Sequence, residues 1–494
     1  MTAFDDLMAF QRDTEALAMI AERLGWDQET VMPRGAAGQR AEELAALESV
    51  LHERRTDPRL GEWLDRAKAP DAAGARALAL IGRDLARASA VPARLASELA
   101  RLTSLSQGIW AEARAADQPA DFLPTLDQVL ALKREEAQAL VAAGFGGGDA
   151  YDALLDDYEP GATASWYADL FGAMRPRLVA LREAVLGADH QPARLNHTFP
   201  EAAQLRIARI CATAFGYDWT RGRLDLAVHP FSSGRFNDSR ITTRVVERDP
   251  FNCLYSTIHE VGHSSYEQGI DADYAFSPLG RGVSMGVHES QSRIYENQLG
   301  RSAPFTGWLY QRMTDAFGDF GIADAAAFHA TVNRVNPGYI RTEADEVHYN
   351  LHIMMRFDLE RALIGGTLDP VDLEEAWNAR FKADFGVAVD RPAHGMLQDV
   401  HWSVGLFGYF PTYALGNVYA GCLNRALRDA VPEIDARLAA GDATPATEWL
   451  RENLQRHGGL YPPQELIARV TGAEPDETAL LDYLEAKYAA IYRL

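Results

Sequence analysis

The segment from Phe251 to Gln268 constrains this chain more than any other. It contains a His-Glu-x-x-His motif at His259–His263. Residues i and i+4 share one face of an α-helix, so the two imidazoles can bind one metal ion. The apolar residues around the motif recur at the helical period, without a proline: Leu254, Ile258 and Val261. The segment therefore predicts a helix with a zinc site, in which Glu260 acts on a zinc-bound water. The alternative is a chance match on a solvated helix.

A catalytic zinc ion needs a third protein ligand and one open position. The extended motif His-Glu-x-x-His-x-x-Gly-x-x-His, which adds a third histidine, is excluded, because Tyr266 and Gly269 stand at the required Gly and His positions. Glu289, on a following helix, is the candidate. The alternative for Glu289 is a surface carboxylate paired with Arg293 at i+4. Two further residues are rival ligands: His288 and Glu267.

A second histidine pair, His348 and His352, also has i, i+4 spacing, and Asp345 precedes it by three residues. A second metal site is conceivable there. The pair lacks a neighbouring glutamate such as the one inside the His-Glu-x-x-His motif, so it fits the core or a substrate-facing surface better. Cys253 is interpreted as a packing residue, because it shares no helix face with the two motif histidines.

The composition fits a soluble globular protein with a hydrophobic core. The chain has 494 residues, of which 47% are hydrophobic and 24% charged. A net charge of −22 argues against nucleic acid as a partner. The start of the chain has no signal-peptide pattern and no apolar run approaches a membrane span, so we expect a cytoplasmic protein without membrane contact. The three scattered cysteines are expected to be reduced and buried: Cys211, Cys253 and Cys422.

Periodicity predicts a mainly α fold with one small β-sheet next to the zinc helix. Before that helix, helices are expected over 4–24, 36–53, 72–88, 92–115, 126–142, 164–186 and 201–215. After it, they are expected over 284–299, 341–364 and 396–430. Strands are predicted at 224–231 and 239–246 with a turn between them, either as a plain hairpin or as an edge for an extended peptide.

A glycine cluster at 144–149 predicts a hinge. We therefore expect a single peptidase unit over residues 1–494 with two parts. Residues 1–143 would form a helical N-terminal part, and residues 144–494 would form the catalytic part with the zinc site.

Six sequence blocks together indicate a family. They are His229–Phe231, Asp238–Thr242, His259–His263, His288–Gln291, Ile340–Asp345 and Gly395–Trp402. The segments Trp26–Pro33 and Tyr409–Asn417 are similar as well. Through these blocks, in this order, the chain resembles the carboxypeptidase Taq family of zinc metallocarboxypeptidases over essentially its whole length.

The resemblance implies a zinc ion bound by His259, His263 and Glu289, one per chain, with Glu260 as the general base. Co²⁺ or Mn²⁺ are possible substitutes for zinc. The resemblance also implies an almost entirely helical fold with a deep active-site groove, flanked by the N-terminal part over residues 1–143, and a homodimer. The activity it implies is release of single residues from peptide C-termini, with broad side-chain tolerance and poor release of proline.

An exopeptidase must recognise a free carboxylate, which the arginine fork does best. Arg341 is the first choice and Arg240 the second, and the alternative for both is an internal salt bridge, for example between Arg341 and Asp345. Candidate oxyanion donors share one predicted helical stretch, each with an alternative as a core residue: His401, Tyr409 and Tyr413. Further substrate-binding candidates come from the blocks: His229, Asp238 and Gln398.

The sequence thus predicts a zinc metallocarboxypeptidase that hydrolyses the C-terminal peptide bond of peptides with a free C-terminus. Two alternatives remain at this point. One is a helical zinc endopeptidase or dipeptidyl-type peptidase, which would share the zinc site but would cut elsewhere in the peptide. The other is a non-catalytic helical binding module with a vestigial site.

Overall fold

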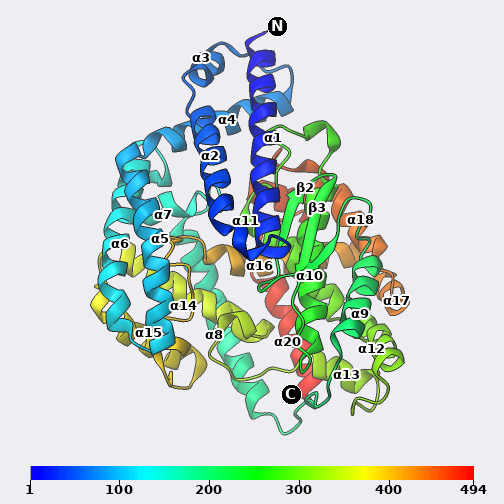
Figure 1. Ribbon diagram of the computed structural model, residues 1–494. Coiled ribbons are helices and arrows are strands. Elements are labelled where there is room, and N and C mark those ends of the chain that lie inside the picture. The colour runs from blue at the N-terminus through cyan, green and yellow to red at the C-terminus, as the bar shows by residue number, and fades with distance from the viewer. Residues whose placement is uncertain (1) are drawn as a thin grey trace.

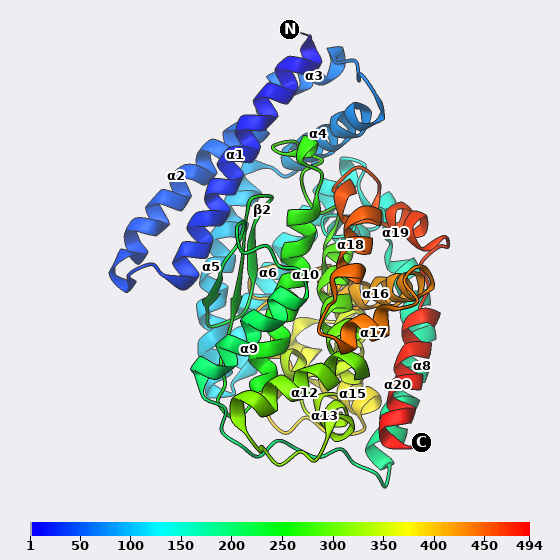
Figure 2. The ribbon, with the colours of Figure 1, turned by 90° about the vertical axis from the view of Figure 1, so that its right-hand side faces the viewer.

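A computed structural model describes residues 2–494 of the chain. Its N-terminal helices form a unit with a small apolar cluster of its own (Figure 1). They are α1 (Ala3–Thr30), α2 (Ala37–Arg55), α3 (Arg59–Arg66) and α4 (Ala72–Ala90). Leu7, Leu60 and Ile81 form the centre of this cluster, apart from the main core. Turning the molecule shows α1 and α2 projecting beyond the body (Figure 2). Ion pairs tie α1 to the body, where Arg235 contacts Glu15 and Glu22.

The next helices belong to the main core. They are α5 (Ala93–Ala116), α6 (Pro119–Ala142), α7 (Ala150–Leu155), α8 (Ala164–Gly187) and α9 (Glu201–Ala214). The predicted helices in this half of the chain are confirmed, although α6 begins seven residues earlier than expected. Its first residue is Pro119, which suits a first helical turn because its missing N–H needs no partner there.

The β-sheet differs from the expected hairpin. Its strands are β1 (Leu224–Leu226), β2 (Ser232–Arg235) and β3 (Asp238–Thr243), in the order β1-β3-β2. β1 pairs with β3 in parallel and β2 pairs with β3 in antiparallel orientation. The segment predicted as a turn therefore contains strand β2. The composition did not indicate this strand, because it includes Gly234, which has a φ of +93°. A side chain at Gly234 would clash with the carbonyl oxygen of Asp238. The strand at this position is therefore defined by its backbone pairing with β3 and not by side-chain packing.

The centre of the molecule is built from α10 (Pro250–Gly269), α11 (Met285–Arg293) and α16 (Pro411–Ala430), which cross near the middle of Figure 1. A π-helix over Ile294–Gly300 continues α11. The other helices of this half are α12 (Ala303–Phe317), α13 (Ala325–Val332), α14 (Glu346–Ile364) and α15 (Leu373–Phe385). The predicted helix around Phe251–Gln268 is confirmed, and its apolar stripe is fully buried: Leu254, Ile258 and Val261.

Two predicted helices begin later than expected. The helix predicted from residue 341 begins at Glu346, because the Asp345 side chain accepts hydrogen bonds from the first backbone N–H groups. The helix predicted from residue 396 begins at Pro411. The segment before it consists largely of turns and contains Gly405 and Gly408 with positive φ.

The chain ends with α17 (Ile434–Ala439), α18 (Thr444–Asn453), α19 (Pro463–Thr471) and α20 (Thr478–Tyr492). The mainly α fold with one small sheet is therefore confirmed. All three cysteines are free and buried, as predicted. Across residues 2–494, no helix combines the length and the apolar character needed to cross a membrane.

Two glycines let α10 and α16 approach α11 closely. A Cβ on Gly262 would lie 2.5 Å from the Gln291 carbonyl oxygen. A Cβ on Gly416 would lie 2.5 Å from Cγ of Glu289. Both contacts are closer than real Cβ atoms allow, so the absence of a side chain at these two positions fixes how α11 sits between its neighbours.

Candidate active site

Helix packing brings the three predicted metal ligands together. α10 supplies His259 and His263, and α11 supplies Glu289. One ligand atom from each lies within 4.8 Å of the others. Oε2 of Glu289 is 3.7 Å from Nε2 of His259 and 3.4 Å from Nε2 of His263. Two imidazole nitrogens and one carboxylate oxygen form a ligand set of the kind that binds catalytic zinc, so these residues fit a divalent metal ion.

The Glu289 carboxylate is fixed by its own helix. Arg293 Nε donates to Oε1 at 2.7 Å, and the Ser292 hydroxyl donates to Oε2 at 3.1 Å. Glu289 is only 6% exposed, so the surface-carboxylate alternative is wrong, although its Arg293 partner is real. Burial opposes ionisation, but the Arg293 guanidinium and the two histidines hold the pKa of Glu289 well below its usual value.

His259 is oriented from behind by a carboxylate that the sequence analysis missed. Its Nδ1 lies 2.9 Å from Oε2 of Glu296, in the π-helix. Arg293 and Arg301 contact the same carboxylate at 3.4 and 3.1 Å. A carboxylate behind a ligating histidine fixes its ring and its tautomer. Glu289, Arg293 and Glu296 follow the i, i+4, i+7 pattern, which is the signal that could have pointed to Glu296.

His263 is supported differently, by the two rival ligands of the sequence analysis. Its Nδ1 lies 2.7 Å from Nδ1 of His288. His288 Nε2 lies 3.0 Å from Oε1 of Glu267. Both residues therefore lie behind His263, and neither belongs to the group of ligand atoms that face one another.

Glu260 lies beside the ligands and is 5% exposed. Burial raises the pKa of Glu260 to about 7, with His259 acting against this shift and the carboxylates of Glu289 and Glu296 adding to it. Among residues 2–494 its side chain has no hydrogen-bond partner. Glu260 is therefore a carboxylate free to exchange a proton with a bound molecule.

The second histidine pair has ordinary partners. His348 Nδ1 lies 2.9 Å from Asp345, and its ring stacks on Phe385. His352 is buried next to Arg356, whose guanidinium contacts its Nδ1 and donates to its carbonyl oxygen. In the described part of the chain, only the ligand group of His259, His263 and Glu289 could hold a metal ion by proximity. The pair thus fits the core interpretation.

Arg341 lies in a buried cluster that carries excess positive charge. Its Nε and Nη2 donate to Asp399 Oδ1 at 3.0 and 2.9 Å. Arg356, fully buried, donates to the other oxygen of Asp399 at 2.7 Å. The alternative of an internal salt bridge therefore holds for Arg341, but with Asp399 and not with Asp345, because Arg341 lies before α14 and outside its helical turns. Two guanidinium groups thus share one carboxylate, which their charges keep ionised, so the pKa of Asp399 lies far below its usual value despite burial.

Tyr349 lies between this cluster and the metal ligands. Arg293, the partner of Glu289, stacks on the Tyr349 ring at 4.3 Å. The hydroxyl of Tyr349 accepts a hydrogen bond from Arg341 Nη1 at 3.3 Å. The guanidinium of Arg341 has five N–H groups, and three of them are bonded to Asp399 and Tyr349. Contacts through Tyr349 and Arg293 connect Arg341 with Glu289.

The three oxyanion-donor candidates form a cluster although they do not share a helix. Ring centroids are 5.8 Å apart for His401 and Tyr409, and 5.1 Å apart for Tyr409 and Tyr413. Only Tyr413 lies in α16, so the prediction of one helical stretch is wrong. Tyr413 also lies 5.2 Å from the Arg341 guanidinium, which places the cluster beside the excess positive charge.

The other substrate-binding candidates have varied surroundings. Arg240 is paired with Asp238 through two hydrogen bonds of 2.6 and 3.0 Å and lies 4.3 Å from the Trp26 ring. Gln398 accepts from the backbone N–H of Arg341 at 2.9 Å and donates to backbone carbonyls, so it braces Arg341. His229 is exposed in the loop between β1 and β2.

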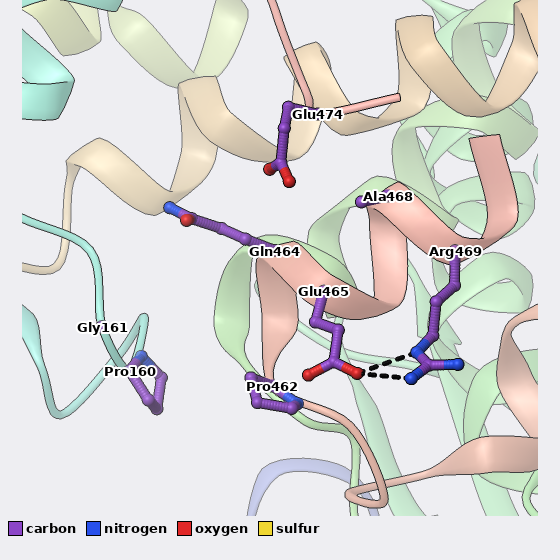
Figure 3. Close-up of a pocket in the computed structure, with 8 residues that line it drawn as sticks. All are labelled: Pro160, Gly161, Pro462, Gln464, Glu465, Ala468, Arg469 and Glu474. Atoms are coloured by element: carbon purple, nitrogen blue, oxygen red, sulfur yellow. Dashed lines mark hydrogen bonds and ion pairs between the residues drawn. The ribbon is translucent and has the colours of Figure 1, made fainter. Parts of the chain in front are cut away.

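A surface hollow of about 570 Å³ lies elsewhere, between the loop at Pro160 and helix α19 (Figure 3). Its lining includes a local ion pair between Glu465 and Arg469 at 2.7 Å. None of the predicted catalytic or substrate-binding residues lines it. The hollow therefore has no role in the site described above.

The helical fold, with two histidines of one helix facing a glutamate of the next, defines the class of helical metallohydrolases. Comparison with known proteins gives the family. Residues 6–488 match the family described as Carboxypeptidase Taq (M32) metallopeptidase. The chain is 42% identical to Thermostable carboxypeptidase 1 of Thermus thermophilus, covering 99% of both chains.

Solved structures agree with this relationship. The M32 carboxypeptidase from Deinococcus radiodurans R1 superposes with a TM-score of 0.96 at 37% identity, covering all of both chains. Metallocarboxypeptidase 1 of Trypanosoma cruzi gives a TM-score of 0.95 at 30% identity over 98% of this chain and 99% of the other. The chain therefore belongs to the carboxypeptidase Taq (M32) family and is a metal-dependent carboxypeptidase. This family membership speaks against the endopeptidase and binding-module alternatives.

Proposed function

We propose that His259, His263 and Glu289 hold one zinc ion per chain and that Glu260 is the general base of peptide hydrolysis. One observation carries this proposal. The three ligand atoms lie within 4.8 Å of one another, and the buried Glu260 stands next to them without a competing partner. Zinc bound there would polarise the scissile carbonyl and make water more acidic.

The protein's own groups then divide the work. A Glu260 carboxylate oxygen accepts a proton from the attacking water and later donates it to the leaving amine nitrogen. Glu296 and His288 hold the two histidine rings in place through their Nδ1 atoms. Tyr409, Tyr413 or His401 supplies a hydrogen bond to the developing oxyanion, which their clustering beside Arg341 supports.

We further propose that Arg341 binds the C-terminal carboxylate of the substrate. Two arginines sharing Asp399 leave one positive charge without a counter-ion in a buried place, which a substrate carboxylate would neutralise. Arg240 is the weaker candidate, because its partner Asp238, which also contacts Arg23, is 35% exposed, so water screens the second positive charge there. Peptides with a free C-terminus are therefore the substrates for which the charge pattern is suited.

Several finer expectations stay predictions. They are the preference for zinc over Co²⁺ or Mn²⁺, the release of single residues with broad tolerance, the homodimer, the cytoplasmic location and the division into residues 1–143 and 144–494. Size-exclusion chromatography with light scattering would test the dimer, and metal analysis of the purified protein would test the metal.

The test of the proposed function is mass spectrometry of a peptide mixture incubated with the zinc-loaded protein. Each peptide is supplied with a free C-terminus and, in a parallel sample, with a C-terminal amide. We expect a ladder of products shortened by one residue at a time from the free termini only. Internal cuts, or equal processing of the amides, would contradict the proposal.

A further inference from the structure

The two proposed histidine ligands are supported by chemically different partners. Behind His259 stands a carboxylate, Glu296, which can only accept a hydrogen bond when ionised. Behind His263 stands another imidazole, His288, which can either donate or accept. The tautomer of His259 is therefore set directly, whereas that of His263 depends on which nitrogen of His288 carries a proton.

The proton count between the two rings has two solutions. His263 Nδ1 and His288 Nδ1 are 2.7 Å apart, so one of them donates and the other accepts. If His288 donates, a neutral His263 carries its proton on Nε2, the atom that faces Glu289, and cannot bind a metal ion there. If His263 donates from Nδ1, its Nε2 lone pair is free for the metal.

Glu267 decides between these solutions. Its Oε1 lies 3.0 Å from Nε2 of His288 and can only accept a hydrogen bond when ionised. A His288 ring with one proton then carries it on Nε2, which leaves Nδ1 as an acceptor for His263. The His288 ring cannot easily turn away, because it packs against Tyr266 and against the backbone at Gly282, where a Cβ would lie 2.7 Å from its Cδ2.

We propose that Glu267, acting through His288, sets the tautomer of His263 that can bind the metal. Both are positioning residues, since they reach the metal only through His263. The inference rests on the proposed ligand set of His259, His263 and Glu289. The proposed role also explains why the side chains of Glu267 and His288, although good metal ligands, do not belong to the group of facing ligand atoms.

Two substitutions at Glu267 separate the hydrogen-bond role from packing. Glu267→Gln keeps a carbonyl oxygen that can accept from His288, whereas Glu267→Leu keeps the bulk without an acceptor. We expect Glu267→Leu to raise the dissociation constant for zinc by about tenfold or more, within the range known for such outer partners, and Glu267→Gln to change it far less. Competition with a chromogenic chelator measures this constant without any activity assay.

His288→Phe is the companion variant, because it removes the acceptor and keeps a planar ring. We expect a rise of about 10- to 100-fold in the zinc dissociation constant. His329→Phe is the matched control: His329 is a histidine held by Thr306 and Asn333, outside the site, and its loss should leave zinc affinity unchanged. Equal affinity for wild type, Glu267→Leu and His288→Phe would overturn the proposal.

Nitrogen-15 spectra of histidine-labelled metal-free wild type test the same idea without any risk of misfolding. Ring-nitrogen shifts report which atom carries the proton. We expect His263 protonated on Nδ1 and His288 protonated on Nε2, and the reverse arrangement would refute the proposed relay from Glu267 through His288 to His263.

His263→Ala separates the relay from the ligand set on which it rests. If it binds zinc like wild type, the proposed ligand set fails; if it loses zinc while Glu267→Leu and His288→Phe do not, only the relay fails.

Discussion

The metal ligand set and the Asp399 cluster are both buried groups of charges, but their imbalances have opposite signs. Around the ligands, the carboxylates of Glu289 and Glu296 pair with the guanidinium groups of Arg293 and Arg301, and the buried Glu260 adds a third carboxyl group that pairs with neither arginine. The Asp399 cluster has the reverse pattern, with two guanidinium groups on one carboxylate. Buried charge is costly unless it is paired, so the first group is suited to a cation and the second to an anion.

The comparison teaches how one site can recognise a chain end. In the proposed function, a metal ion would complete the first group, and a substrate's C-terminal carboxylate would complete the second. Tyr349 joins them, because it contacts Arg293 with its ring and Arg341 with its hydroxyl. If both groups act as proposed, the fixed separation between them would select the terminal peptide bond for cleavage.

The largest expected effect comes from Glu260→Gln, which keeps the metal ligands and removes the group that moves the proton. We expect hydrolysis to fall by about 10²- to 10⁴-fold while zinc remains bound one per chain. Turnover of a free-acid peptide and metal content are measured on the same samples. Glu201→Gln, on an exposed position of α9, is the control. Full activity in Glu260→Gln would remove Glu260 from the mechanism.

Arg341→Ala tests the positively charged cluster. Hydrogen bonds to a charged group contribute about 1.5–3 kcal/mol, which predicts a loss of about 10- to 100-fold in kcat/KM for free-acid peptides. Any residual turnover of the matching C-terminal amides should change little. Arg240→Ala is the comparison variant and should show no such selectivity. Selective loss in Arg240→Ala instead would move the carboxylate site to the sheet.

Glu296→Gln sharpens the comparison on the negatively charged side. The new amide oxygen can still accept a hydrogen bond from His259, but the substitution removes one of the negative charges around the ligand set. We expect the zinc dissociation constant to rise by about tenfold. Glu343→Gln, an exposed glutamate, should leave the constant unchanged. An unchanged constant in Glu296→Gln would mean that excess negative charge does not contribute to metal binding.

Gly416→Ala tests whether close helix packing holds Glu289. The added methyl would meet Cγ and Cβ of Glu289 at 2.5 and 2.6 Å, and such overpacking costs about 1–3 kcal/mol of unfolding free energy. Denaturant unfolding measures it. Gly172→Ala in α8 is the matched control, because its Cβ would meet nothing within 4 Å, and it should stabilise by about 0.5–1 kcal/mol. Equal stability changes in both variants would contradict the packing account.

The sequence predicted most helices because their apolar spacing is local. The stripe of Leu254, Ile258 and Val261 defined the metal helix before any tertiary contact was known. The sequence did not predict β2, since a strand containing Gly234 exists only through its pairing with β3. The sequence-based prediction also began α16 too early, at residue 396, because periodicity does not reveal the positive φ of Gly405 and Gly408.

The site was predictable where chemistry follows spacing along one helix. Two histidines at i and i+4 and a nearby glutamate could be named from sequence, and the structure groups them. The partner of Arg341 could not, because Asp399 is 58 residues away and joins it only through the fold. Likewise, no local pattern shows that His288 stands behind His263 and does not compete with it.

A zinc titration of the metal-free protein tests the central claim most directly. Calorimetry is run on wild type, Arg341→Ala and His263→Ala. The account predicts one zinc per chain with similar affinity for wild type and Arg341→Ala, since only the negatively charged group takes the ion, and no specific binding for His263→Ala. One-to-one binding of wild-type affinity by His263→Ala would contradict it.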